Sequence, residues 1–447
     1  MKKSCNKYLE KNFGVVPLRL LFFCLAGLMV LQLTACLSRE KPGKNLLTTE
    51  TEEVRIVNLF GPMEKTRPGG ENAARNAFDK TIFMAEEKLG VRVDYITYTA
   101  EDYQDKTYDE VALDRARNDM DDIYLLNPDV IRKLASEGKL ADLSELDGVE
   151  NLREVVKTAN VVDGKLVGIP QEVVVYGLFI NEDIFKECGL KMPETPEEFL
   201  ECCRVLKEKG YETPVGANRW WLETFVFAQA YADLYNGGNT EAEIAALNSG
   251  EKKYSDYMRS GFEFLQELID KGYIDAEKAY KSEAIDGEGP DFLDQKTPIV
   301  MAYWSAANAD TAYGKPDFNM TVIGFPSSRG QMPVVSMTGL CVGINAEHKE
   351  DALDTLNVVL SDEAFQVYAE VNRVISPSKS VETDCIPALK PLNDRIEEGV
   401  YVLGTNAGMD LEQWGNVCLV VRELLGGATV DACMAELDRL QKEALGK

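Results

Sequence analysis

The sequence predicts an α/β fold that is divided into at least two lobes. Short apolar segments rich in β-branched residues alternate with segments of helical period along most of the chain. Its length of 447 residues exceeds what one hydrophobic core usually supports. No Pro-, Gly- or Ser-rich linker separates two consecutive domains, so we expect lobes that are joined by several crossings of the chain.

The first lobe is predicted from a strand-helix-strand pattern. Residues 54–60 form an apolar strand, and the helical pattern that follows ends at Gly90. Residues 91–97 alternate as a second strand, and 122–126 form a third one after another helix. Asn127, which is followed by proline, caps the next helix. This connectivity implies a parallel sheet.

A second set of elements begins near residue 164. Residues 166–180 form an apolar strand, and the run 195–198, Thr-Pro-Glu-Glu, is a capping box that starts a helix. Residues 298–304 and 339–347 are further strands. Thr429 caps the last helix.

The N-terminus is predicted to be an export signal with a lipid attachment site. Five basic residues within the first 19 precede an uncharged apolar stretch at 20–35, which is shorter than the roughly 20 residues that span a bilayer. The stretch ends in Leu-Thr-Ala-Cys36, which resembles the lipobox of bacterial lipoproteins. The resemblance implies a lipoprotein signal peptide at 1–35 and palmitate on Cys36. Residues 36–53 then form a flexible tether that holds the body at the extracellular face of the cell membrane.

The charge balance argues against nucleic acid as a partner. The chain has 48 Lys plus Arg and 75 Asp plus Glu, a formal net charge of -27. Such a surface repels phosphate backbones.

The scarcity of histidine argues against most classes of enzyme active site. The single histidine, His348, is expected to be solvated and without a partner. Zinc sites of the two- or three-histidine type and Ser-His-Asp triads therefore lack support, as do nucleophile-elbow, P-loop and dinucleotide motifs. No cofactor is expected and an enzyme is not favoured, although carboxylate pairs for glycoside hydrolysis remain open in so acidic a chain.

Two further groups of residues are predicted to be structural. An acidic loop lacks the spacing of an EF-hand and is expected to be solvated, with calcium binding left open; its acids are Asp286, Glu288, Asp291 and Asp294. The cysteines after Cys36 are odd in number and irregular in spacing, so a disulfide framework is not indicated, although one disulfide remains open. Cys203 is expected to pack in the core.

Several segments fall in the order of a known family. These segments are 164–210, PIVMAYW at 298–304, GFPSSRG at 324–330, and 339–366. Together they resemble the maltose-binding-protein-like class (family 1) of bacterial extracellular solute-binding proteins of ABC importers. Pro196 departs from the family, which often has tryptophan there.

The resemblance implies a two-lobed periplasmic-binding-protein-like fold (type II) with a ligand cleft between the lobes. Three crossovers are expected near 172–176, 336–339 and 374–377. Lobe one then combines 54–172 with 339–374, and lobe two combines 173–338 with 375–447. Such a protein is expected to be a monomer that closes by a hinge around its ligand and is recognised by the transmembrane subunits of the permease.

The four tryptophans are the main candidates for binding. Trp304 matches the family's aromatic residue at the end of a Met-containing strand, where a ring stacks on a sugar, and Trp414 matches a further aromatic near the C-terminus. Trp220 and Trp221 lie in a segment that supplies other contacts, and one of them is expected to bind while the other packs. A flat ring suits the apolar face of a pyranose, but tryptophan also often packs into a core, and that alternative stays open.

Further candidates come from the same resemblance. Tyr176 lies at a crossover, and Arg219 could bond a hydroxyl or a carboxylate of the ligand, or equally a surface acid. Weaker candidates lie in lobe one, where strand-end and capping roles are equally open: Phe60, Glu64, Asn127 and Asp129.

The favoured function is that of a lipid-anchored, extracellular substrate-binding subunit of an ABC transporter that captures a mono- or oligosaccharide. Two alternatives remain open. The same fold could bind a non-sugar polar solute, or the chain could be a surface glycan-active or adhesion lipoprotein.

Overall fold

The computed structural model describes residues 54–62, 77–103, 106–282, 287–305, 316–381, 387–404 and 408–446. All of them except Val54 belong to one compact unit, Arg55–Lys447. The signal peptide, Cys36, the tether and Glu64 lie outside the described residues. None of the described helices is both long and apolar enough to cross a bilayer.

The first of two larger sheets is built on the N-terminal strands. Strands β1 (Arg55–Gly61), β2 (Val91–Thr97) and β3 (Ile123–Leu126) pair in parallel, as the sequence predicts. β13 (Gly339–Val342) joins β3 in antiparallel orientation, so the order is β13-β3-β1-β2. We call the part of the chain built on this sheet lobe one.

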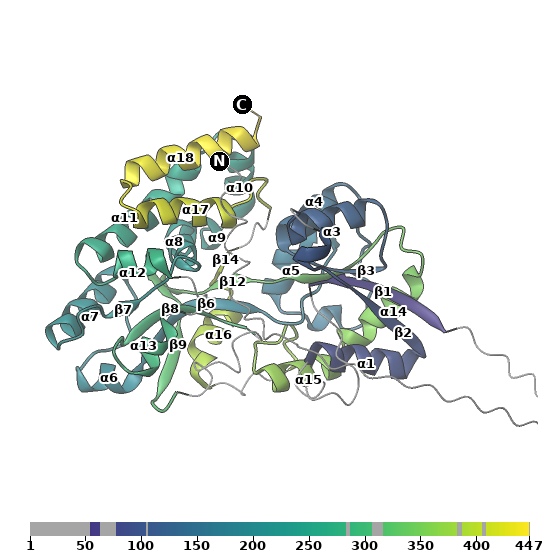
Figure 1. Ribbon diagram of the computed structural model, residues 1–447, viewed down its shortest axis with the longest axis horizontal. Helices are drawn as coiled ribbons and strands as arrows, with labels where there is room; N and C mark the ends of the chain where they lie inside the picture. The colour runs from purple at the N-terminus through teal and green to yellow at the C-terminus, as the bar shows by residue number, and fades with distance from the viewer. Residues whose placement is uncertain are drawn as a thin grey trace, which may run out of the picture. The chain divides into compact units, whose positions relative to one another are not determined.

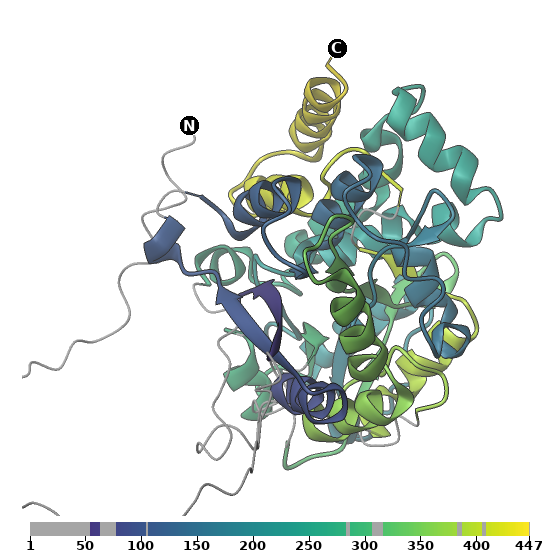
Figure 2. The same cartoon turned by 90° about the vertical axis from the view of Figure 1, so that its right-hand side faces the viewer.

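Helices cover both faces of this sheet. α3 (Tyr108–Arg117) and α4 (Pro128–Ser136) lie on one side, and α1 (Ala77–Leu89), α14 (Lys349–Val359) and α15 (Asp362–Asn372) lie on the other (Figure 1). Figure 2 shows β1 and β2 side by side, with α1 beneath them. α1 ends where predicted, because Gly90 adopts a positive φ of 66°.

Smaller elements complete lobe one. These are α2 (Ala100–Tyr103), η2 (Val149–Asn151), α5 (Glu154–Asn160), and the paired strands β4 (Val161–Val162) and β5 (Lys165–Leu166).

The second larger sheet is centred on β6 (Val174–Asn181). β8 (Ile299–Trp304), β9 (Met320–Ile323) and β12 (Val334–Ser336) pair with β6 in antiparallel orientation. β7 (Val215–Gly216) and β14 (Val402–Leu403) extend the edges, and β10 (Phe325–Ser327) forms a hairpin with β11 (Gly330–Met332). Gly177 allows β9 to approach β6, since a Cβ there would overlap the carbonyl oxygen of Ile323. We call the part built on this sheet lobe two.

The helices of lobe two gather mostly around α8 (Leu222–Ala230). α8 and α18 (Val430–Ala444) both pack on α11 (Tyr254–Asp270), and α17 (Trp414–Leu425) packs on α8 and α18 (Figure 1). The remaining helices are α6 (Glu182–Glu187), α7 (Pro196–Glu208), α9 (Ala232–Asn236), α10 (Thr240–Ser249), α12 (Ala276–Lys281), α13 (Gly289–Leu293), η4 (Pro387–Leu389) and α16 (Lys390–Glu397).

Local signals for helix starts are confirmed in lobe two. The hydroxyl of Thr195 accepts from the backbone N–H of Glu198, and the Glu198 side chain accepts from the backbone of Thr195, which is the predicted capping box. Thr429 caps α18 in the same manner through the N–H of Ala432. Cys203 is fully buried in the core of this lobe, as expected.

The described chain passes between the two larger sheets at three places. Ile169 still bridges to Leu340 of β13 before the chain enters β6. β12 leads directly into β13, and the third passage lies between α15 and α16, where Ile375 bridges back to Val173. The residue boundaries of the two lobes remain our proposal.

Candidate functional site

Four aromatic rings from separate elements meet in lobe two. They are Tyr176 of β6, Trp221 just before α8, Tyr303 of β8 and Trp414 at the start of α17, and we call them the aromatic cluster. The ring centroid of Tyr176 lies 5.3 Å from Trp414, 5.8 Å from Trp221 and 5.8 Å from Tyr303, and Trp221 and Tyr303 are 4.6 Å apart. Tyr176 is buried, whereas the other three residues are partly exposed. The cluster therefore presents aromatic surface to solvent.

The strand register explains which residue of β8 joins the cluster. Tyr176 pairs directly with Tyr303, so the two side chains lie on the same face of the sheet. Trp304 pairs with Val175 and lies on the opposite face.

Trp304 is a core residue in this structure. Only 1% of its surface is exposed, its ring stacks on Phe179 at a centroid distance of 6.3 Å, and its indole N–H donates to the carbonyl oxygen of Arg373 at 2.8 Å. The expectation that this ring is open to a ligand is therefore not met. The physical reason is the alternation of β8, which turns Tyr303 rather than Trp304 toward the cluster; sequence reasoning missed Tyr303 although this alternation was the available signal.

The adjacent tryptophans separate, as their neighbouring positions suggested. Trp221 belongs to the aromatic cluster, while the ring of Trp220 contacts the guanidinium groups of Arg219 and Arg422, whose Cζ atoms are 5.0 Å and 4.7 Å from its centroid. Arg219 also donates to the carbonyl oxygen of Tyr280 at 3.2 Å. The structure thus does not bring Arg219 and Trp220 into the cluster.

A cavity of about 590 Å³ lies between the lobes near the start of α17. Lobe one contributes Asp109, Asp129 and Arg132 to its wall, and lobe two contributes Asp410 and Glu412. The guanidinium of Arg132 forms an ion pair with Asp410 at 2.8 Å across the cavity wall. The lining is therefore rich in carboxylates that come from both lobes.

Two of these carboxyl groups are perturbed by their surroundings. Burial raises the pKa of Asp109, and the hydrogen bond that the Asn127 amide donates at 2.8 Å partly offsets this shift. Burial also raises the pKa of Glu412, while the backbone N–H groups of Gly415 and Asn416 act in the opposite direction. Asn127 stands at the N-cap position of α4 as predicted, but its side chain makes no cap and binds Asp109 instead.

A buried acid lies next to the aromatic cluster. Glu223, in the first turn of α8, is 0% exposed, and neither carboxyl oxygen has a hydrogen-bond partner among the residues that the structure describes. Burial raises its pKa well above the ordinary value, and its charge would interact with Tyr176, Cys418 and Arg422. The sequence gives no signal for this residue, since an acid in the first turn of a helix is usually solvated.

The remaining candidates have other environments. Phe60 is fully buried and stacks on Tyr108 at 5.5 Å, so it is a core residue of lobe one. His348 has a partner, contrary to expectation: its backbone N–H donates to Asp122 at 2.9 Å, and its Nδ1 lies 3.4 Å from the same carboxylate. The reason is that β3 begins beside the start of α14, which brings these residues together.

The acidic loop and the cysteines also have structural surroundings. Asp286 and Cys385 lie outside the described residues. Glu288 is buried and accepts from Asn218, and the described residues contain no group of three or more acids, cysteines or histidines arranged to hold a metal ion. The described cysteines are all free thiols.

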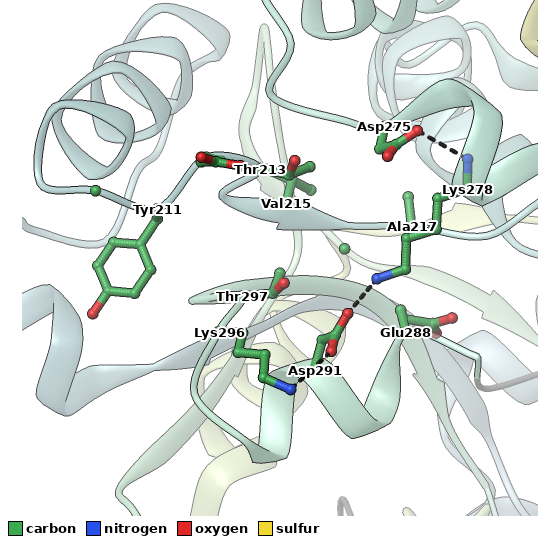
Figure 3. A pocket seen from close by; sticks show the side chains of 13 residues that line it. Tyr211, Thr213, Val215, Ala217, Asp275, Lys278, Glu288, Asp291, Lys296 and Thr297 are labelled. Carbon is green, nitrogen blue, oxygen red and sulfur yellow. Dashed lines mark hydrogen bonds and ion pairs between the residues drawn. The ribbon is translucent and has the colours of Figure 1, made fainter.

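A second cavity, of about 460 Å³, lies beside β7 (Figure 3). Lys278 and Lys296 both reach Asp291 there, and the backbone N–H of Lys278 donates to Asp275. Tyr211 is the only ring among its described lining residues. Its two lysines are therefore already paired, and it offers little aromatic surface.

Comparison with known proteins adds a family and a fold. Residues 68–364 match a family model described as "Bacterial extracellular solute-binding protein". Over 239 residues the chain is 26% identical to the multiple sugar-binding protein of Streptococcus mutans serotype c. That match covers 52% of this chain and 56% of the relative, so the chain spans about half the length of the curated relative.

Solved structures with the same fold have low sequence identity. The apo form of RafE from Streptococcus pneumoniae has 15% identity and a TM-score of 0.69, covering 88% of this chain and 98% of that one. A sugar transporter from Bacillus licheniformis, in complex with stachyose, has 18% identity and a TM-score of 0.66, covering 88% and 99%. These similarities confirm the two-lobed α/β fold.

Proposed function

Since the chain belongs to the bacterial extracellular solute-binding protein family, we propose that it is the substrate-binding subunit of a carbohydrate ABC importer. It captures a mono- or oligosaccharide outside the cytoplasm by hinge closure and delivers it to the permease. A lipid on Cys36 holds it at the membrane.

The observation that carries the sugar assignment is the aromatic cluster. A pyranose has an apolar C–H face and a rim of hydroxyl groups, so it binds well to partly exposed flat rings. Trp221, Tyr303 and Trp414 provide such rings on the buried support of Tyr176.

We assign the polar half of the site to the cavity between the lobes, whose described lining residues do not include the four rings themselves. Its volume of about 590 Å³ lies within the usual range for small-molecule sites. Asp109 and Glu412 offer acceptors for hydroxyl groups, and Glu412 lies two residues before Trp414. The names of the Streptococcus mutans relative and of the stachyose complex support the same ligand class.

Contacts between the lobes support a hinge mechanism. Arg132 pairs with Asp410, and the hydroxyl of Tyr401 lies 3.4 Å from that of Thr158. A ligand that touches both walls of the cavity would add to these contacts and so favour the closed state. No bond in the ligand is broken in this proposal.

A saccharide panel tests the proposal. The full-length chain, purified in detergent, is titrated with stachyose and with mono- to tetrasaccharides of other linkages, while tryptophan emission and melting temperature are recorded. We expect a saturable change in emission, a higher melting temperature, since a ligand at 100 times its Kd stabilises by about 2.7 kcal/mol, and recovery of intact sugar by mass spectrometry.

Each alternative gives a different result. A panel that changes neither emission nor melting temperature would exclude sugar binding, and a response to other polar solutes alone would favour a non-sugar ligand. Cleaved sugar would favour a glycan-active enzyme.

A further inference from the structure

Two arginines of lobe two have no role in the proposed saccharide site. The guanidinium groups of Arg219 and Arg422 both contact the ring of Trp220, with Cζ atoms 5.0 Å and 4.7 Å from the ring centroid. In a chain with 75 acidic residues, neither arginine forms an ion pair within the part that the structure describes. Other arginines, such as Arg204 and Arg439, form ion pairs with glutamates.

Three hydrogen-bond donors are also left without acceptors at this place. The Nε atoms of Arg219 and Arg422 and the indole Nε1 of Trp220 are all buried and have no partner among the described residues. Buried polar groups are nearly always satisfied, and a buried donor without an acceptor destabilises the fold. Three orphan donors on three adjoining side chains indicate room for an oxyanion acceptor. Buried Glu223, whose carboxyl oxygens also lack partners among the described residues and whose charge interacts with Arg422, is the acceptor within the protein that competes with such a ligand.

A cavity lies beside one of the two arginines. Arg422 lines a cavity of about 460 Å³ together with Tyr280, Glu423 and the turn after α17, residues 426–428. The guanidinium of Arg219 donates to the backbone of the same Tyr280. A solute in this cavity therefore reaches the side chain of Arg422.

Trp220 adjoins Trp221 of the aromatic cluster in the chain, but Arg422 lies farther along α17. Arg422 follows Trp414 by eight residues of α17, a rise of roughly 12 Å along the helix. The end of α17 favours one cation in its last turn, but this dipole effect accounts neither for Arg219 nor for the orphan donors.

We propose that Arg219, Trp220 and Arg422 form a second binding site, which takes a carboxylate or phosphate group of a small solute. The planar guanidinium groups donate paired hydrogen bonds to the oxyanion. The indole ring stabilises both cations by a cation–π contact with each.

The test is anion binding to the full-length chain in detergent. Inorganic phosphate and, separately, glucuronate are added at constant ionic strength, with sodium chloride as the reference salt, and tryptophan emission and melting temperature are followed. We expect at least one of the two anions to give a saturable response. Arg219→Gln and Arg422→Gln should each weaken its binding by about tenfold, the loss of one charge-assisted interaction. The matched control is Arg439→Gln, which removes an exposed arginine that is already paired with Glu436 and Glu443, and it should bind like the wild type.

A ring variant and a competition experiment distinguish this site from the saccharide cleft. Trp220→Phe keeps the ring but removes the N–H, so it should retain folding and lose part of the affinity for the anion. Saturating saccharide should leave the anion affinity unchanged; competition would place the anion in the cleft and overturn the proposal.

Equal responses in the wild type and the arginine variants, or no saturable response, would also overturn it. A third result would also contradict the proposal. If the anion bound to the Glu223→Gln variant but not to the wild type, the two arginines would be partners of the buried Glu223 carboxylate.

Discussion

Replacing Trp304 with alanine should destabilise the fold and leave the affinity for saccharide almost unchanged. The ring is 1% exposed, stacks on Phe179 and donates to the carbonyl oxygen of Arg373. Truncating a buried aromatic side chain costs about 3–5 kcal/mol, which includes the cavity that remains. The orphaned carbonyl oxygen adds about 1 kcal/mol. In a chain of this size the melting temperature should fall by roughly 5–10 °C.

Tyr303→Ala should give the opposite result. Its ring is partly exposed and lies 4.6 Å from Trp221, so its loss removes part of the proposed binding surface but opens a smaller internal cavity. The affinity should fall about 10- to 100-fold, which corresponds to roughly 1.4–2.7 kcal/mol. The melting temperature should change less than in Trp304→Ala.

The assay compares both variants with the wild type by calorimetric titration with the best saccharide of the panel and by thermal unfolding. Phe179→Leu serves as a control, since it loosens the packing around Trp304 without touching the cluster. The reasoning is refuted if Trp304→Ala keeps its melting temperature and loses affinity, because its ring would then contact the ligand.

Other substitutions test separate parts of the structure. Glu223 has a raised pKa, so the folded protein keeps a proton that the unfolded chain releases above the ordinary value of 4.5. Stability should therefore decline as pH rises from there, by up to about 1.4 kcal/mol per pH unit, and Glu223→Gln should remove this decline in melting curves between pH 5 and 8. Gly177→Ala should cost about 1–3 kcal/mol in urea unfolding, because its Cβ overlaps the carbonyl oxygen of Ile323. Arg132→Gln breaks a largely exposed ion pair between the lobes and should reduce saccharide affinity by no more than about fivefold, less at high salt. Cys36→Ala should abolish palmitate labelling and release the chain from membranes.

Each of these has a distinct contrary result. If the melting temperatures of the wild type and of Glu223→Gln changed with pH in the same way, the Glu223 carboxyl would be ionised in the folded protein. An unchanged unfolding midpoint for Gly177→Ala would mean that β9 moves away from β6 at little cost. A salt-independent loss of affinity in Arg132→Gln would point to direct ligand contact, and palmitate labelling that survives Cys36→Ala would place the lipid elsewhere.

Local sequence signals predicted much of the fold because they act over a few residues. The capping box at Thr195, the stop at Gly90 and the cap at Thr429 depend on backbone groups within one helical turn, and all three are confirmed. The parallel order of β1, β2 and β3 follows from their connectivity. The antiparallel partner β13 comes from more than 200 residues later, which no local pattern encodes.

The site was harder to predict because it depends on register and burial. Tyr303 and Trp304 look equally suitable in the sequence, and only the pairing of β8 with β6 decides which one shares a face with Tyr176. In the sequence Glu223 looks like an ordinary acid at the start of a helix, whereas in the folded protein it is fully buried. His348 looks solvated in the sequence because Asp122, its partner, lies 226 positions away.

The most direct test of the account is a crystal structure with the saccharide that raises the melting temperature most. We predict a sugar ring with its apolar face on Trp221, Tyr303 or Trp414 and with hydroxyl groups bonded to carboxylates of the cavity between the lobes. A sugar bound instead in the charged cavity beside β7, with the aromatic cluster left bare, would contradict the proposed site.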